Sequence, residues 1–205
     1  MSEPPAPAKH RLFFALWPAP ELQVRLSQIA RAVQQELGGK ATRTESIHLT
    51  LVFLGDVAAS RLSEVAQIGE RVRCEPFTLT LDRSGCWSHN RIAWVAPAST
   101  PAALSMLTSE LQAQVRSLGF AIDERPHAPH LTLVRKAAHA RRVEILEEAV
   151  SWLVDHFVLV RSQLDAQGSR YAVVGRWPKE RTEPTNANIE PLERSKKIPP
   201  PSRGR

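Results

Sequence analysis

The pentapeptide His-Leu-Thr-Leu-Val occurs twice in the chain, at residues 48–52 and again at residues 130–134. Successive side chains of a β-strand point to opposite faces, so in each copy the histidine and threonine share one face and the leucines share the other. Two imidazoles suit phosphoester chemistry, because a neutral one accepts a proton from the attacking oxygen while a protonated one donates to the leaving oxygen. The repeat therefore predicts a phosphoester-cleaving site built around His48 and His130.

Three further residues of the two motifs are suited to holding a phosphate. The hydroxyl groups of Thr50 and Thr132 can donate hydrogen bonds to non-bridging phosphate oxygens. Arg135 follows His130 by five residues, and its guanidinium group matches a phosphate in charge and shape. A single His-x-Thr is most often structural, but two copies with five identical residues in matching places favour a shared site. This chemistry requires no metal ion and no other cofactor.

The surrounding sequence predicts a mixed fold in which strands and helices mostly alternate. The helical spacing of apolar residues predicts helices over residues 20–39, 60–73, 101–118 and 141–153. Apolar or alternating runs predict strands over residues 11–18, 46–55, 77–82, 91–97, 129–135, 156–164 and 171–178. We expect the third and fourth of these strands to be joined by a loop that contains Gly85 and Asn90.

The order of these elements indicates an internal duplication. Each copy of the motif is preceded by a strand and a long helix and is followed by another helix, so the chain divides into two similar lobes. Two lobes that face each other would place the two motif strands on opposite walls of one cleft.

The ends of the chain differ in composition from residues 11–178, which we take as the folded body. Residues 1–10 are proline-rich, and we expect them to be flexible. Residues 179–205 hold five prolines and few apolar side chains, so we expect a disordered basic tail. With seven basic and four acidic residues (7 − 4 = +3), this tail carries half of the net charge of +6. The mildly basic body suits a small phosphate ligand as well as a polynucleotide.

Several classes of protein do not fit the sequence. There is no apolar run long enough to span a membrane and no secretory signal pattern at the N-terminus. Cys74 and Cys86 form neither a disulfide framework nor the spacing of a metal site. We therefore expect a cytoplasmic monomer.

The paired motifs resemble the signature of the 2H phosphoesterase superfamily, which is two copies of H-x-[ST]-x. Four segments are similar to its RNA 2′,3′-cyclic phosphodiesterase branch, historically called 2′-5′ RNA ligases: RLFFALWP (11–18), IHLTLVFLGDV (47–57), PHLTLVRK (129–136) and RYAVVGRWP (170–178). The resemblance implies a bilobal α+β fold whose two antiparallel sheets face each other across a central cleft, with helices outside. It also implies a substrate, either RNA with 2′,3′-cyclic phosphate termini or a small cyclic nucleotide.

The resemblance further implies the reaction and the role of each site residue. A 2′,3′-cyclic phosphate would be opened to a 2′-phosphomonoester without metal. His48 would donate the proton to the leaving 3′ oxygen, His130 would accept one from water, and the two threonines with Arg135 would hold the phosphate. His127 departs from the family pattern, in which an aromatic or apolar residue commonly precedes the Pro-His pair.

Two alternatives remain open. The same site could join RNA ends as a 2′-5′ RNA ligase by the reverse reaction, with the cyclic phosphate as the energy source, since the sequence contains no glycine-rich phosphate-binding loop. Alternatively, the cleft could belong to a non-catalytic RNA or nucleotide-binding module. Binding of a cyclic nucleotide without turnover would support that second alternative.

Overall fold

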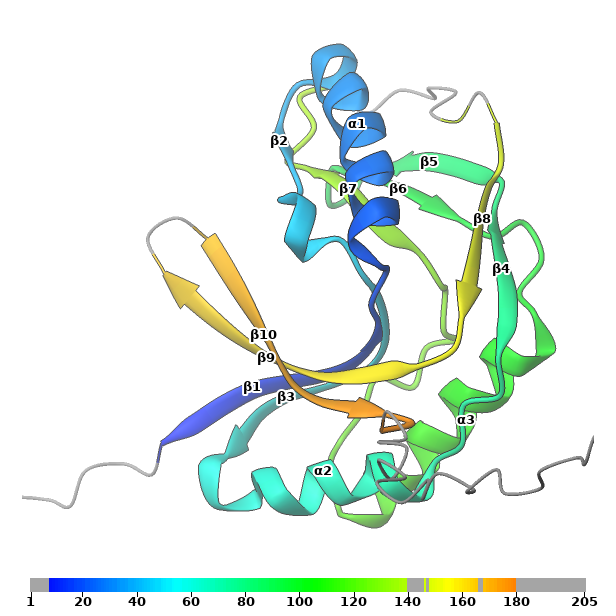
Figure 1. The fold of residues 1–205 in the computed structure, drawn as a ribbon. Helices are drawn as coiled ribbons and strands as arrows, with labels where there is room; N and C mark the ends of the chain where they lie inside the picture. Colours follow the sequence, from blue (N-terminus) through cyan, green and yellow to red (C-terminus); the bar gives the residue numbers. More distant parts are fainter. Residues whose placement is uncertain (1–7, 140–145, 147, 166–167, 180–205) are drawn as a thin grey trace, which may run out of the picture.

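The structure, a computed structural model, describes residues 8–139, 146, 148–165 and 168–179. Over these residues the chain forms two antiparallel sheets with helices packed outside them, so the predicted α+β fold is confirmed (Figure 1). The strands are β1 (Lys9–Leu16), β2 (Lys40–Ala41), β3 (Leu49–Ala58), β4 (Phe77–Leu81), β5 (Arg83–Trp87), β6 (Ile92–Ala96), β7 (Leu131–Arg135), β8 (Val150–Val154), β9 (Phe157–Asp165) and β10 (Gly168–Trp177). The helices are α1 (Pro20–Leu37), α2 (Leu62–Arg71) and α3 (Ala102–Ser117), with 3-10 turns η1 (Thr44–Ser46) and η2 (Ala59–Arg61).

The ends of the chain fall mainly outside this description. Residues 1–7 of the predicted N-terminal segment and residues 180–205 of the predicted tail are not among the described residues. Lys9 and His10, which the composition places in the N-terminal segment, belong to β1. Within the described part of the chain, no helix is long and apolar enough to cross a membrane.

The larger sheet divides at its centre into two halves. Its strand order is β10-β9-β1-β3-β7-β6-β5, with β2 also paired to β7. The two motif strands, β3 and β7, share a single antiparallel pair, Leu49 with Leu131. Each strand begins at this pair and they run from it in opposite directions, so the pair lies at the centre of an approximate two-fold relation. The motif strands, expected on opposite walls, therefore start side by side and then continue into different halves.

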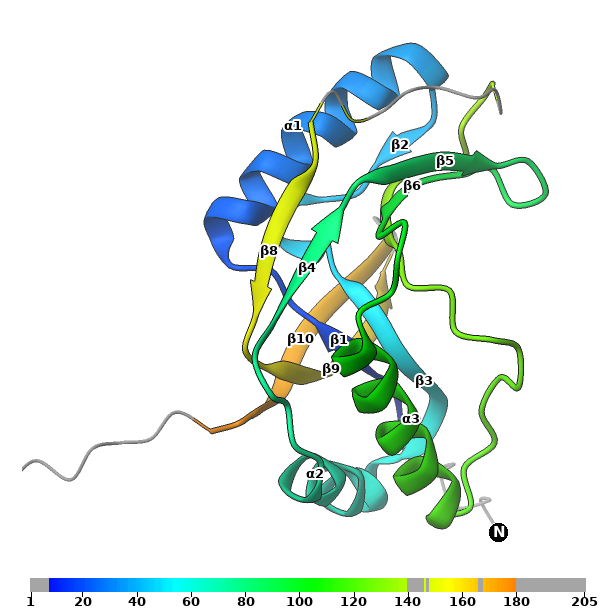
Figure 2. The same ribbon diagram turned by 90° about the vertical axis from the view of Figure 1, so that its right-hand side faces the viewer.

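The first repeat runs from β1 to β5 and the second from β6 to β10, and the two exchange elements across this centre. β5 comes from the first repeat but pairs with β6 of the second, whereas β9 comes from the second repeat but pairs with β1 of the first. In the same way α1 packs on β7 and α3 packs on β3. In Figure 2, α1 lies over the upper half of the larger sheet and α3 over the lower half. Because each half is completed by the other repeat, we do not expect either repeat to fold by itself.

The predicted leucine faces of the motifs form part of the core. Leu49, Leu51, Leu131 and Leu133 are all buried, with at most 2% of their surface exposed. Burial of each leucine side chain contributes about 1.5–3 kcal/mol relative to an exposed one. The hydrophobic effect at these leucines therefore fixes the opposite face, and with it the direction of the histidines and threonines.

The helix predicted over residues 141–153 is wrong at its C-terminal end, where Val150–Val154 form β8. Along this strand buried Val150, Trp152 and Val154 alternate with exposed side chains, which is the period of a strand. β8 pairs with β4 to form the second sheet. The apolar residues of this segment also fit helical spacing, so the local sequence predicts a helix. The strand that pairs with β8 lies far upstream, and the local pattern does not reveal it. Residues 141–145 and 147 lie outside the described residues.

The loop predicted between residues 82 and 91 contains a strand, β5, which pairs with β6. Gly85 lies opposite Trp94 in this pairing, and a Cβ atom at Gly85 would lie 2.6 Å from the Trp94 ring. The glycine is therefore required by close packing within a strand and does not mark a turn.

A buried tryptophan joins α2 to the large sheet. Trp177 packs between Gly69 of α2 and Gly175 of β10, and a Cβ atom at either glycine would lie 2.2 Å from its ring. The absence of a side chain at both glycines therefore lets α2 lie against β10.

Replacing Gly69 with alanine is expected to lower the free energy of unfolding by about 1–2 kcal/mol, measured by urea denaturation. Overpacking costs about 1–3 kcal/mol, here at the upper end, and the better helix propensity of alanine offsets about 1 kcal/mol. Ser63→Ala on the exposed face of α2 is the control and should change stability by less than about 0.5 kcal/mol. Combining Gly69→Ala with Trp177→Leu should remove the clash. An unchanged or raised stability of Gly69→Ala alone would contradict this packing.

Candidate active site

A cavity of about 250 Å³ lies where the two halves of the sheet meet. The structure brings all five residues of the predicted site to its wall: His48, Thr50, His130, Thr132 and Arg135. Each histidine directly precedes its strand and each threonine is the second residue of its strand. The alternation of the two strands therefore presents all four motif side chains on the face opposite the buried leucines.

The register of the two strands places each histidine beside the threonine of the other motif. Leu49 pairs with Leu131, and an antiparallel register extended by one residue sets His48 opposite Thr132 and Thr50 opposite His130. A phosphate bound between the imidazoles would thus meet one hydroxyl group from each motif.

The two imidazoles are held in the same tautomer. His48 Nδ1 lies 2.7 Å from the carbonyl oxygen of Ser46, and His130 Nδ1 lies 2.8 Å from that of Ala128. A carbonyl oxygen only accepts hydrogen bonds, so Nδ1 must carry a hydrogen in both rings. In each neutral ring Nε2 is then the basic nitrogen. Both rings are therefore prepared to exchange a proton at Nε2.

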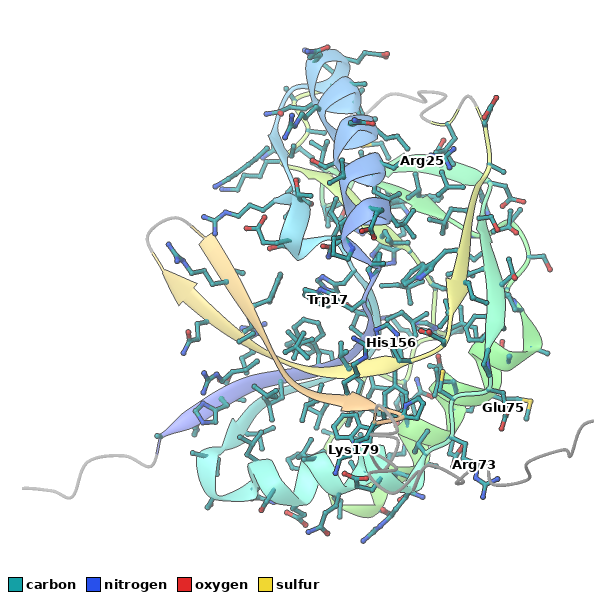
Figure 3. All side chains as sticks on the ribbon, in the orientation of Figure 1. Trp17, Arg25, Arg73, Glu75, His156 and Lys179 are labelled. Carbon is teal, nitrogen blue, oxygen red and sulfur yellow. The ribbon has the colours of Figure 1, made fainter. Side chains whose placement is uncertain are left out.

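Aromatic rings enclose His48 more completely than His130. The indole of Trp17 is stacked on the His48 ring at a centroid distance of 5.2 Å, and Phe13 and Tyr171 contact it at 5.0 and 5.1 Å. Figure 3 shows Trp17 in the region between α1 and the β9–β10 hairpin. His130 has an edge-to-face contact with Trp87 at 4.6 Å.

The local sequence does not identify Trp17, Trp87 or Tyr171 as partners of the histidines, whereas the alternation of β1 predicts that one of Phe13 and Phe14 lines the cleft. Phe13 and Trp17 are four residues apart, which is a spacing that puts both on one face at the end of β1. That spacing could have indicated a shared environment, whereas Trp87 and Tyr171 reach the site through pairings that no local pattern reveals. Of the two first-strand phenylalanines, Phe13 faces the site and Phe14 packs in the core against Phe157.

The surroundings favour the neutral form of both imidazoles in the free protein. Burial lowers the pKa of His48 to about 4, against the opposing effect of the Ser46 hydrogen bond, and the positive charge of Arg135 lowers it further. Burial also lowers the pKa of His130 below its ordinary value, with His127 and Arg135 acting in the same direction. An anionic ligand between the rings would raise both pKa values.

The chemistry of the cavity wall suits an anion. Lys40, Arg43 and Arg135 line it, and among the described residues that line it none is acidic. Lys40 and Arg43 were not predicted as site residues, because nothing in their local sequence places them beside the motifs. Pairing of β2 with β7 brings them there.

His127 joins the two halves of the sheet at the site. Its Nε2 lies 2.9 Å from the carbonyl oxygen of Thr50 and must donate to it. This hydrogen bond and the pair Leu49–Leu131 both connect the first motif to the second, so His127 helps to fix the spacing between them. The residue that departs from the family pattern, His127, therefore contacts the first motif directly.

The described ranges contain no group of three or more histidine, cysteine, aspartate or glutamate side chains that could hold a metal ion. Cys74 and Cys86 are free thiols. Burial raises the pKa of Cys74 to about 11, which keeps it protonated at neutral pH.

A second cavity of about 720 Å³ adjoins the first. Thr50 and His130 line both cavities, whereas His48 lines only the smaller one among the described residues. Solvent can therefore approach His130 from a side that does not reach His48.

A family model, curated relatives and solved structures that are similar to this chain all belong to one group of phosphoesterases. The family model described as LigT like Phosphoesterase matches the chain twice, over residues 16–94 and 95–171, as expected of an internal duplication. An RNA 2′,3′-cyclic phosphodiesterase of Escherichia coli (strain K12) is 32% identical over 177 residues, covering 86% of this chain and 98% of the relative. A protein of the same description from Thermus thermophilus is 31% identical and covers 82% of this chain and 89% of the relative. The crystal structure of E. coli LigT complexed with 3′-AMP superposes with a TM-score of 0.74, at 30% identity, over 83% of this chain and 98% of that one.

Proposed function

The chain belongs to the LigT-like phosphoesterase family, and we propose that it hydrolyses the 2′,3′-cyclic phosphate at the end of an RNA, or of a small nucleotide, to a 2′-phosphomonoester. The observation that carries the proposal is the pair of imidazoles with identical tautomers at one cavity, flanked by two threonines and Arg135. Relatives described as RNA 2′,3′-cyclic phosphodiesterases, aligned over most of the chain, support the choice of bond.

In the proposed mechanism the two histidines act on opposite sides of the phosphorus atom. His130 Nε2 accepts a proton from water as its oxygen attacks phosphorus, and His48 Nε2–H donates a proton to the 3′ oxygen as the bond from phosphorus to that oxygen breaks. Thr50, Thr132 and Arg135 bind the non-bridging oxygens, where negative charge accumulates. His48 is neutral in the free protein, so it takes up its proton as the anionic phosphate binds. No metal ion takes part.

Two features support this division of roles. The second cavity reaches His130 and provides a route for water to the base. His48 lies among Phe13, Trp17 and Tyr171, which shield the side of the leaving group from water.

Incubation of the protein with adenosine 2′,3′-cyclic phosphate, and with an RNA that ends in one, tests the proposal when EDTA is present and the product isomer is identified. We expect the 2′-monophosphate from both substrates. A 3′-monophosphate product would reverse the choice of leaving oxygen, and activity that disappears in EDTA and returns with a divalent metal would contradict metal independence. Binding without turnover of either substrate would instead identify a binding module.

A further inference from the structure

The catalytic cavity is lined by two cationic side chains that the proposed mechanism does not use. A nucleoside 2′,3′-cyclic phosphate has a single negative charge, and the proposed mechanism assigns that group to the histidines, the threonines and Arg135. Lys40 and Arg43 line the same cavity, as do Ser169 and Tyr171 of β10. Lys40 and Arg43 have no role in the proposed reaction.

Strand pairing brings one of these cations directly beside Arg135. Lys40 is the register partner of Arg135 in the antiparallel pairing of β2 with β7. Directly opposed side chains of such a pair have Cβ atoms about 4.5–5.5 Å apart on the same face. The pairing therefore places a second cationic side chain on the cavity wall that carries Arg135.

A glycine turn makes this approach possible. Gly38 and Gly39, which connect α1 to β2, have positive φ angles of 67° and 90°. A Cβ atom at Gly39 would lie 2.6 Å from the carbonyl oxygen of Arg135. A residue with a side chain would push β2 away from β7, so this turn sets the position of Lys40.

The backbone that carries the two cations is anchored on both sides. The Thr42 N–H donates to the carbonyl oxygen of Leu133 on β7 at 2.7 Å. The Thr44 hydroxyl group donates to Ser27 Oγ of α1 at 2.8 Å. Lys40 and Arg43 therefore extend from a fixed segment, which lowers the entropy that is lost when they bind a ligand.

We propose that Lys40 and Arg43 bind a second phosphate, the one on the 5′ side of the terminal nucleoside. The inference rests on the proposed function, which places the cyclic phosphate at the histidines. The preferred substrate then carries a phosphate at both ends of its last nucleoside, as an RNA terminus does. A mononucleotide with a 5′-phosphate presents the same chemistry, and an unphosphorylated cyclic nucleotide does not.

The test compares three substrates: adenosine 2′,3′-cyclic phosphate, its 5′-phosphorylated form, and a diadenosine dinucleotide that ends in a cyclic phosphate. For the wild-type protein we expect kcat/KM to be at least about tenfold higher for the second or third than for the first. In the double variant Lys40→Gln with Arg43→Gln this preference should disappear, because kcat/KM for the second and third substrates should fall at least about tenfold more than kcat/KM for the first. Loss with the dinucleotide but not with the 5′-monophosphate would identify RNA as the source of the phosphate.

A matched pair of substitutions controls for net charge. Arg25→Gln with Arg31→Gln removes the same charge from exposed positions of α1 that do not line the cavity. Figure 3 shows Arg25 on the side of α1 away from the β9–β10 hairpin. An equal loss in this control, or an equal loss on all three substrates in the first variant, would overturn the proposal.

A binding measurement separates this proposal from the proposed function. Calorimetry with adenosine 2′-monophosphate and adenosine 2′,5′-bisphosphate requires no turnover. The bisphosphate should bind at least about tenfold more tightly to the wild-type protein and lose that advantage in the Lys40→Gln, Arg43→Gln variant. Equal affinities in the wild type would overturn the second phosphate site, even if the enzyme hydrolyses cyclic phosphates.

Discussion

Replacement of either His48 or His130 with asparagine is expected to lower kcat for cyclic phosphate hydrolysis by about 10²–10⁴-fold while the fold is retained. The asparagine amide nitrogen can take the place of Nδ1 and donate to the carbonyl oxygen of Ser46 or Ala128. It puts no group that exchanges protons at the position of Nε2. Since both imidazoles act in one transition state, the double variant should lose little more than either single variant.

The controls for these variants separate chemistry from binding. His139→Asn, at an exposed position that does not line either cavity, should leave kcat unchanged. The affinity for adenosine 2′-monophosphate should stay within about tenfold in the His130 variant, because both threonines and Arg135 remain and each charged hydrogen bond contributes about 1.5–3 kcal/mol. A variant at His48 or His130 that keeps more than about a tenth of the wild-type kcat would exclude that residue as acid or base.

The parts of the site that could be predicted from sequence are those that local alternation determines. In each motif the leucines become buried, and that burial directs the histidine and threonine to the cavity. The long helices α1 and α3 were predictable for a similar reason, because their apolar residues recur at helical spacing. Repetition of one motif then indicated that two such faces belong together.

The parts that could not be predicted depend on pairings between distant segments. β8 has a sequence that reads as a helix locally and becomes a strand through its pairing with β4. The position of Lys40 depends on β2 reaching β7, and that of Tyr171 on β10 lying beside β9. Such contacts are decided by the free energy of the whole fold, so a local pattern does not contain them.

The value of kcat/KM is expected to follow a bell-shaped pH profile with its maximum below pH 6.5 and to fall about tenfold for each pH unit above that value. The productive enzyme carries one proton on the two imidazoles. Burial lowers the pKa of His48 to about 4 and that of His130 below the ordinary value of 6.5, so the singly protonated form is lost as pH rises. The doubly protonated form limits the rate at the acidic end. Initial rates at low substrate concentration and constant ionic strength measure this profile.

Two expected shifts of the pH profile test the same explanation further. The profile of kcat should lie at higher pH than that of kcat/KM, because the bound phosphate anion favours protonated imidazoles. In Arg135→Gln the absolute rate falls, but the alkaline limb of kcat/KM should move to higher pH, since this cation lowers the pKa of both histidines. The cyclic phosphate diester is a monoanion throughout the range and adds no limb of its own. A profile that is flat from pH 5 to 9, or a limb that moves to lower pH in Arg135→Gln, would rule out paired proton transfer by two buried imidazoles.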